Sequence, residues 1–141
     1  MTPAPHDTSI SSLGTCRYPS PLHRIGGVEA PFKTDADRTL YHSNLLEDGR
    51  DVSTPSYEKA GAREMIFFDP PRTTVGIVTC GGLCPGLNDI IRGIVMRCYQ
   101  QYGISRVYGF RFGYEGLVQR YGHTPLILKP SSVEQAHHFG G

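Results

Sequence analysis

The stretch GIVTCGGLCPGLNDIIRGIV, from Gly76 to Val95, places three kinds of local signal in a row. Its first residues are apolar and β-branched, which predicts a short strand. Residues 79–88 then gather three glycines and a proline, a composition typical of a tight loop. The residues after that loop carry an amphipathic helical pattern. The sequence therefore predicts a strand-loop-helix unit, and the N-terminus of such a helix is able to bind a phosphate group.

The flanking residues extend this unit to a β-α-β arrangement. We expect a central strand over residues 72–80, buried on both faces of a sheet, because its apolar stretch lacks polar alternation. The helix is predicted to run to about Gln101, with Asn88 as a possible cap and Gly103 at its end. Residues 104–110 predict the next strand, parallel to the first. The apolar face of the helix is predicted to contain Leu87, Ile90, Ile91, Ile94, Val95 and Cys98.

A second glycine-rich turn, Phe110–Leu117, follows the second predicted strand. In an open parallel sheet, ligands bind outside the carboxyl ends of the strands, so we expect the two turns to form two walls of one site. Residues 125–128 predict a further short strand. The spacing from Ser131 to Glu134 is that of a capping box, which predicts a short helix to about His137.

Gly81 and Gly82 are the candidate ligand-binding residues of the first loop. Without a Cβ atom they allow the backbone to approach a phosphate closely. The loop has neither the GK[ST] of a Walker A motif nor the spacing GxGxxG. The alternative reading is that the glycines only form a tight strand-to-helix turn, in which Pro85 fixes the bend.

Composition excludes some classes of partner. The net charge of the 141 residues is +1, so no broad basic surface for nucleic acid is expected. Mean hydropathy is −0.29 and no apolar run is long enough to cross a bilayer, so no membrane role is expected. The four cysteines contain no CxxC pair, which favours reduced thiols and a cytoplasmic protein. A Ser-rich, acid-poor N-terminus leaves an organellar presequence as the alternative.

The chain divides in composition near residue 63. Residues 1–63 are polar and broken by Pro, Gly and Ser, which predicts a largely extended or disordered N-terminal extension with a possible short strand at residues 38–41. Residues 64–71 form a short apolar run closed by two prolines, which suits an edge strand. We therefore expect an extension over 1–63 and an α/β domain over 64–141.

The quoted stretch, together with GFRFGYEGL at residues 109–117, resembles the N-terminal nucleotide-binding region of the 6-phosphofructokinase family. The likeness is to the eukaryotic branch with a long N-terminal extension, and it covers roughly residues 58–141. It implies an α/β fold, a partial doubly wound, Rossmann-like parallel sheet at the start of the family's N-terminal domain. It also favours ligand binding over a purely structural role for the loop, since family members bind a nucleotide there.

Function follows from this resemblance as an expectation. Family members phosphorylate fructose 6-phosphate to fructose 1,6-bisphosphate in glycolysis, with ATP and Mg²⁺ or, in some members, pyrophosphate, and usually form homo-tetramers. Matched residue by residue, the resemblance assigns donor binding to Gly81, Gly82 and Tyr114; a packed loop aromatic is the alternative for Tyr114. Arg92 matches an effector-site arginine of bacterial relatives, but the second arginine of that pair is replaced by Met96, which favours a solvated or inter-subunit role.

The resemblance also implies what this sequence lacks. The family's Gly-Gly-Thr/Ser, Gly-Gly-Asp and Thr-x-Asp-x-Asp segments, which hold the catalytic and metal-binding carboxylates, do not occur in it. We therefore expect no catalytic residue and no metal ligand in these residues, and a truncated N-terminal piece, inactive by itself, that ends at Gly140-Gly141 within a family motif. The alternatives are a pyrophosphate-dependent fragment or a non-catalytic nucleotide-binding or subunit-binding module. An unrelated dinucleotide-binding protein, with Glu115 as a loose ribose ligand, is disfavoured by the missing GxGxxG.

Overall fold

A computed structural model describes residues 8–22, 24–25, 28–29, 31–41 and 55–139. The chain divides into two compact units, residues 1–67 and 68–141, and each is described by itself. The expectation attached to Gly140-Gly141 falls outside the described residues. Within the described part of the chain, no helix has the length and apolar character needed to cross a membrane.

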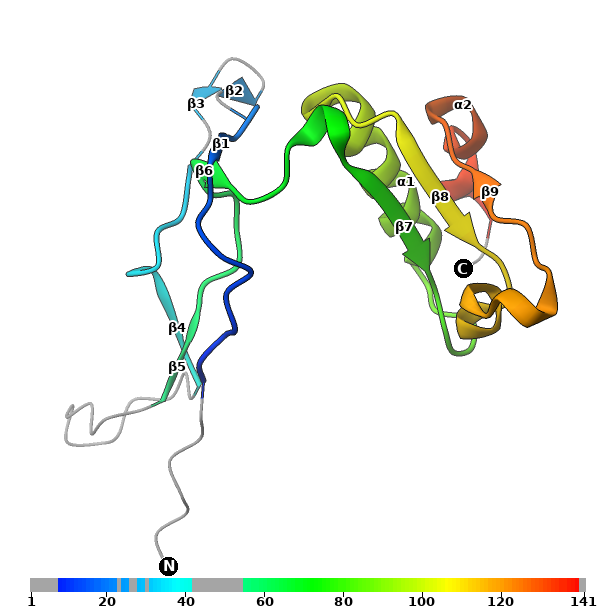
Figure 1. Cartoon of the computed structure of the whole chain (residues 1–141), viewed down its shortest axis with the longest axis horizontal. Coiled ribbons are helices and arrows are strands. Elements are labelled where there is room, and N and C mark those ends of the chain that lie inside the picture. Colours follow the sequence, from blue (N-terminus) through cyan, green and yellow to red (C-terminus); the bar gives the residue numbers. More distant parts are fainter. Residues whose placement is uncertain (1–7, 23, 26–27, 30, 42–54, 140–141) are drawn as a thin grey trace, which may run out of the picture. The chain divides into compact units, whose positions relative to one another are not determined.

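The second unit contains the predicted β-α-β arrangement (Figure 1). Strand β7 (Thr74–Val78) leads through the first loop into helix α1 (Leu87–Arg97), and β8 (Arg106–Phe110) follows. Strands β7 and β8 are parallel, which confirms the prediction. The sheet order is β7-β8-β9, and β9 (Leu126–Ile127) is antiparallel to β8, so the three-stranded sheet is mixed rather than purely parallel.

Short helical turns complete this unit. A 3-10 turn, η1 (Pro70–Arg72), precedes β7, and two others, η3 (Gly113–Leu117) and η4 (Gln119–Tyr121), follow β8. Helix α2 (Pro130–Val133) and the 3-10 turn η5 (Ala136–His138) come after β9. Both pack against α1, which places the helical elements together beside the sheet.

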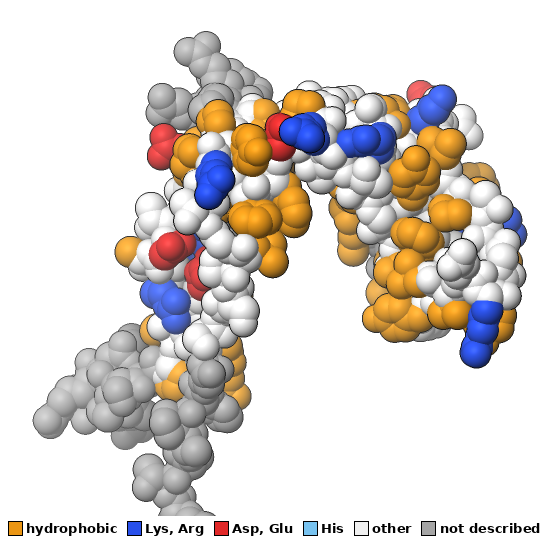
Figure 2. All heavy atoms as spheres, viewed as in Figure 1, with side chains coloured by type: hydrophobic (Ala, Val, Ile, Leu, Met, Phe, Trp, Pro, Cys, Tyr) orange, Lys and Arg blue, Asp and Glu red, His pale blue; other side chains and the backbone are white. Residues whose placement is uncertain are grey.

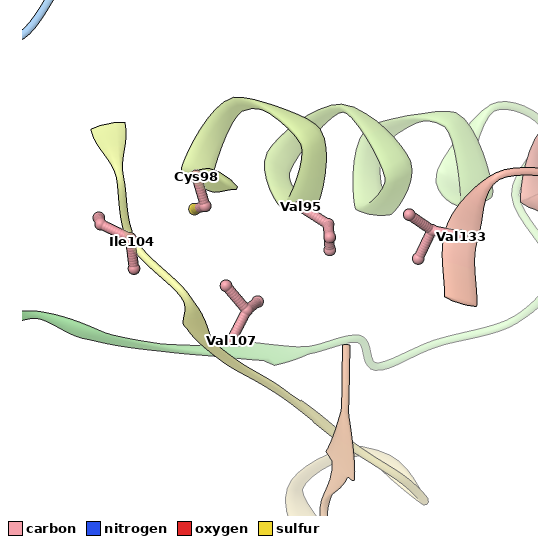
Figure 3. Packing of buried hydrophobic residues seen from close by; sticks show 5 residues of the cluster. All are labelled: Val95, Cys98, Ile104, Val107 and Val133. Atoms are coloured by element: carbon pink, nitrogen blue, oxygen red, sulfur yellow. The ribbon is translucent and has the colours of Figure 1, made fainter. Parts of the chain in front are cut away.

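Five residues form the buried core of the second unit (Figure 3). Val95 of α1 and Val107 of β8 are fully buried, and their side chains point toward one another. Burial raises the pKa of the Cys98 thiol because the low dielectric disfavours the thiolate. This thiol therefore behaves as a small apolar core side chain. The core members are Val95, Cys98, Ile104, Val107 and Val133.

The expectation that the first strand is central and buried on both faces was wrong. Strand β7 has a described partner on one side only, because β8 is the middle strand of the three. Val75 and Ile77 pack against the core from one face, whereas Thr74 and Gly76 on the other face are exposed. Successive residues of this apolar run therefore alternate between the two faces of the strand. One face packs on the core and the other is exposed.

The predicted apolar face of α1 was also only partly right. Val95 and Cys98 are buried and Ile91 packs against them, but Ile90 is 60% exposed and Ile94 is 39% exposed. The apolar stripe is wider than the contact that β8 and α2 make with the helix. Figure 2 shows that apolar side chains lie on the surface of this unit, interrupted by Lys and Arg side chains.

The ends of the helices differ from prediction in two places. Helix α1 begins after Gly86, which has a left-handed φ of 84°, and Asn88 does not cap it but donates from Nδ2 to the Phe139 carbonyl at 3.0 Å. Helix α2 begins at Pro130, before the predicted cap Ser131, and the Lys129 N–H donates to the Ser132 hydroxyl. Pro is well suited to the first helical position because it lacks an N–H to satisfy.

The C-terminal end of the first helix agrees with prediction. Helix α1 continues into a π-helical turn, η2 (Cys98–Tyr102), and ends at Gly103, whose left-handed φ of 66° lets its N–H bond the Cys98 carbonyl. Glycine is favoured there because the Cβ of other residues makes a left-handed backbone sterically unfavourable.

Gly93 offers a direct test of the α1 assignment. It lies inside the helix, and a Cβ built on it meets nothing within 4 Å. Glycine inside a helix costs about 0.5–1 kcal/mol relative to alanine through backbone entropy. We expect Gly93→Ala to raise the free energy of unfolding of the chain by about that amount, measured by urea denaturation. A loss of stability would show that this backbone is not helical in solution.

The described part of the first unit consists of short paired strands. Strand β1 (Tyr18–Pro19) is antiparallel to β6 (Met65–Ile66), β2 (Arg24–Ile25) to β3 (Val28–Glu29), and β4 (Arg38–Leu40) to β5 (Ser56–Glu58). Strand β4 confirms the predicted short strand. Residues 65–66 form a strand as expected, but in this unit, because their partner is β1.

Arg63 links three segments of the first unit. Its Nη2 lies 2.5 Å from Glu58 Oε1 and donates to the Lys59 carbonyl, and its Nε lies 3.8 Å from Asp35 Oδ1. Nearby, the Thr34 N–H and hydroxyl donate to Asp37, which lowers the pKa of that carboxyl. Among the described residues of this unit, these polar contacts link β5 to the segments that contain Asp35 and Arg63.

Candidate functional site

The two glycine-rich turns lie in contact at the carboxyl ends of β7 and β8. The last residues of these strands, Val78 and Phe110, are register partners, so both turns start at the same edge of the sheet. A Cβ built on Gly113 would lie 2.8 Å from Cys80 Sγ and 3.3 Å from the Thr79 carbonyl oxygen. The second turn therefore packs directly on the start of the first, as the parallel arrangement predicts.

Gly81 and Gly82 are glycines for different reasons. Gly81 has φ of 119°, a backbone conformation that other residues rarely adopt, so the turn itself requires glycine there. Gly82 is not among the described residues with positive φ, and its added Cβ meets nothing within 4 Å. Both are exposed. Nothing in the described fold therefore explains glycine at position 82, whereas the close approach of a ligand would.

The N-terminus of α1 directly follows the first turn. Its first N–H groups contribute a partial positive charge that favours anions. The Leu87 N–H donates to the Cys84 carbonyl and the Ile90 N–H to the Gly86 carbonyl, so the turn is closed onto the helix. Asp89 lies in the first helical turn and offsets part of this positive potential. The helix end alone is therefore a weak anion site.

The second turn is held in a constrained backbone. Phe112 adopts a left-handed conformation with φ of 63°, and Gly113 follows with φ of 58°. A Cβ on Gly116 would lie 2.1 Å from the Arg111 carbonyl oxygen, so only glycine fits there. Tyr114 lies on this turn with 69% of its surface exposed, which shows that its ring is not packed in a core. A constrained turn thus presents an exposed aromatic ring.

Sequence reasoning missed a cluster beside this turn. His123 Nε2 lies 2.7 Å from Glu115 Oε1, and the His123 and Phe112 rings lie with their centroids 4.5 Å apart and their planes tilted by 46°. The Arg111 guanidinium lies over the same Phe112 ring, 4.9 Å from its centroid. His123 follows the turn in an irregular segment, where no periodic pattern signals that it folds back onto Glu115.

The other candidate residues have structural roles or stay unassigned. Arg92 Nε donates to the Glu134 carbonyl at 3.3 Å, which ties α1 to the segment after α2. Cys80 and Cys84 are exposed free thiols. Over the ranges that the structure describes, no three His, Cys, Asp or Glu side chains are grouped so as to hold a metal ion.

Each unit has a cavity bordered by described residues. One of about 440 Å³ is bordered by Asn88, Ser131 and Phe139 in the second unit. Another, of about 710 Å³, is bordered by Lys33, Arg63 and Met65 in the first. Residues 81–86 of the first turn and Tyr114 of the second are exposed, and so accessible to a ligand.

Comparisons with known proteins identify the family. Residues 74–141 match the family model described as Phosphofructokinase. The chain is 40% identical over 142 aligned positions to an ATP-dependent 6-phosphofructokinase of Amycolatopsis methanolica, and 39% identical over 140 to one of Trypanosoma brucei brucei, each alignment covering 96% of this chain. A Trypanosoma cruzi relative of the same name is 51% identical over 84 residues, 60% of this chain.

The matched region contains both glycine-rich turns, β7, α1 and β8, which are the elements that position the candidate site. The chain belongs to the phosphofructokinase family. It spans 31% of the length of the Amycolatopsis relative and 28% of the length of the Trypanosoma brucei relative.

Proposed function

We propose that this chain supplies the donor-binding turns of an ATP-dependent 6-phosphofructokinase, which phosphorylates fructose 6-phosphate to fructose 1,6-bisphosphate. The observation that carries the proposal is Gly82, an exposed glycine that the described fold does not require. It lies in the loop that packs on the turn bearing Tyr114. The names of the relatives support ATP over pyrophosphate as the donor.

The proposed roles follow from the chemistry of the residues. Gly81 shapes the turn, Gly82 leaves room for the phosphates of ATP, and the Tyr114 ring lies against the nucleotide. Phosphoryl transfer depends mainly on positioning and on neutralising charge. These residues would hold the donor in place, and the groups that move protons or bind fructose 6-phosphate would come from other parts of the enzyme.

Mg²⁺ is part of the same proposal. The ion would neutralise charge on the ATP phosphates and orient the transferred group. Its protein ligands would be carboxylates from other parts of the enzyme. The first turn of α1 offers one carboxylate, Asp89, which is too few to hold the ion. From family membership alone, we also propose that the whole enzyme is a cytoplasmic homo-tetramer. On the same ground, residues 1–63 are proposed to be an N-terminal extension.

An exchange enzyme tests this function. In it, the segment of the Trypanosoma brucei relative that aligns with this chain is replaced by residues 1–141, which match it at 39% identity. We expect the exchange enzyme to form ADP in the presence of both ATP and fructose 6-phosphate, measured by a coupled assay. Pyrophosphate in place of ATP should give no product.

The unmodified relative is the positive control, and an exchange enzyme with Gly82→Val is the matched negative control. A folded exchange enzyme that binds fructose 6-phosphate but shows no ATP-dependent turnover would contradict the proposal. Turnover with pyrophosphate and not with ATP would show that pyrophosphate is the donor. The assignment of donor binding to the two turns would be unaffected.

A further inference from the structure

The turn that bears Tyr114 has a backbone that its own residues do not favour. Among the described residues other than glycine, Phe112 is the one with a positive φ, 63°. Its side chain is 58% exposed. A left-handed conformation is unfavourable for an L-residue because its Cβ crowds the following carbonyl oxygen. Such a conformation persists only where neighbouring contacts hold it. The contacts that hold this turn are therefore informative.

Two contacts close on this turn from the segment after η4. The Glu115 carboxylate lies 2.7 Å from His123 Nε2, and the same imidazole ring lies 4.5 Å from the Phe112 ring. One histidine thus contacts residues on both sides of Tyr114. Its own side chain is 28% exposed, compared with 52% for Glu115, so the imidazole is the more buried partner.

We infer that Glu115 and His123 are positioning residues of the donor site, which fix the turn so that Tyr114 presents its ring to the nucleotide. This inference rests on the proposed function. Tyr114 lies between Phe112 and Glu115 along the chain, so a turn anchored at both ends by His123 limits the directions open to its exposed ring. Holding the ring in advance lowers the entropy lost when ATP binds.

The hydrogen bond and the ring contact are separable by substitution. His123→Ala removes both, His123→Phe keeps a ring beside Phe112, and His123→Gln keeps an N–H that is able to donate to Glu115. In the exchange enzyme we expect His123→Ala to raise the KM for ATP about fivefold, with the KM for fructose 6-phosphate and kcat within about twofold. His123→Gln should restore most of the loss, and His123→Phe less.

A double-mutant cycle tests whether the two residues act together. We expect Glu115→Ala to give most of the increase in the KM for ATP that His123→Ala gives, because it removes the hydrogen bond and leaves the ring contact. The double variant should be no worse than His123→Ala, which already removes both contacts. The matched control is His138→Ala, an exposed histidine of η5 remote in sequence from the turn, which should leave the KM for ATP unchanged.

A measurement on the 141-residue chain itself needs no ATP. The Val118 N–H donates to the Glu115 carbonyl at 3.0 Å and closes the turn. We expect its hydrogen exchange to quicken about fivefold in His123→Ala, whereas the Leu128 N–H, bonded to the Val107 carbonyl in the sheet, should not change.

These results separate the inference from the proposed function. An exchange enzyme without ATP-dependent turnover would defeat the proposed function, while faster Val118 exchange would still show that His123 holds the turn. An unchanged KM for ATP together with unchanged Val118 exchange would overturn the inference. So would equal increases in the KM for ATP and for fructose 6-phosphate, because they would indicate general loss of structure.

Discussion

Gly82→Val is expected to remove most of the ATP affinity while leaving the fold intact. Gly82 does not adopt a positive φ, and a Cβ there meets no atom within 4 Å, so a larger side chain fits the described structure. The same side chain would occupy the space through which phosphates approach the loop. Such steric conflict costs about 1–3 kcal/mol, or roughly a 5- to 150-fold increase in the KM for ATP.

Two measurements on Gly82→Val decide the point together. Steady-state kinetics of the exchange enzyme gives the KM for ATP, and thermal denaturation of the chain gives its stability, which we expect to change by less than about 0.5 kcal/mol. Leu83→Ala is the matched control, because Leu83 is the next residue and 91% exposed. A normal KM for ATP, or a chain that unfolds, would refute the role assigned to Gly82.

Gly116→Ala is expected to give the largest loss of stability of the substitutions considered. The added methyl group would lie 2.1 Å from the Arg111 carbonyl oxygen, and both atoms belong to the constrained turn. No flexible side chain is available to move aside, so the backbone itself must shift. We expect a cost of roughly 3 kcal/mol or more, measured by urea denaturation, since backbone shifts exceed ordinary overpacking.

Gly122→Ala provides the comparison for this loss. Gly122 has φ of 67°, and its added Cβ meets nothing within 4 Å, so only the conformational cost of about 1 kcal/mol applies. In the exchange enzyme, Gly116→Ala should also raise the KM for ATP, because the displaced turn bears Tyr114. Equal stability of Gly116→Ala and Gly122→Ala would show that the turn has a different backbone in solution.

The sequence predicted the elements of the second unit because their signals are local. A β-branched run, a glycine loop and a helical period identify β7, α1 and β8 from residues close in the chain, and Gly103 identifies the end of the helix. The helix cap was harder, because Asn88 bonds the distant Phe139 carbonyl instead of the helix N-terminus. Long-range partners override local capping preferences.

Burial was predicted less well than secondary structure. The apolar run of β7 carries no information on how many strands lie beside it. In α1, the helical pattern assigns Ile90 to the apolar face, although its side chain is exposed. The contact between Gly113 and Cys80 follows from the parallel register, so the adjacency of the two turns was predictable. The fold-back of His123 onto Glu115 was not, since it depends on an irregular segment.

Photolabelling with an azido derivative of ATP tests the central claim most directly. In the exchange enzyme, trypsin would release the first turn within the peptide Thr73–Arg92 and the second within Phe112–Arg120. We expect light-dependent labelling of one or both peptides, abolished by excess ATP and identified by mass spectrometry. ATP-protected labelling confined to other peptides would contradict the assignment of the donor site to these turns.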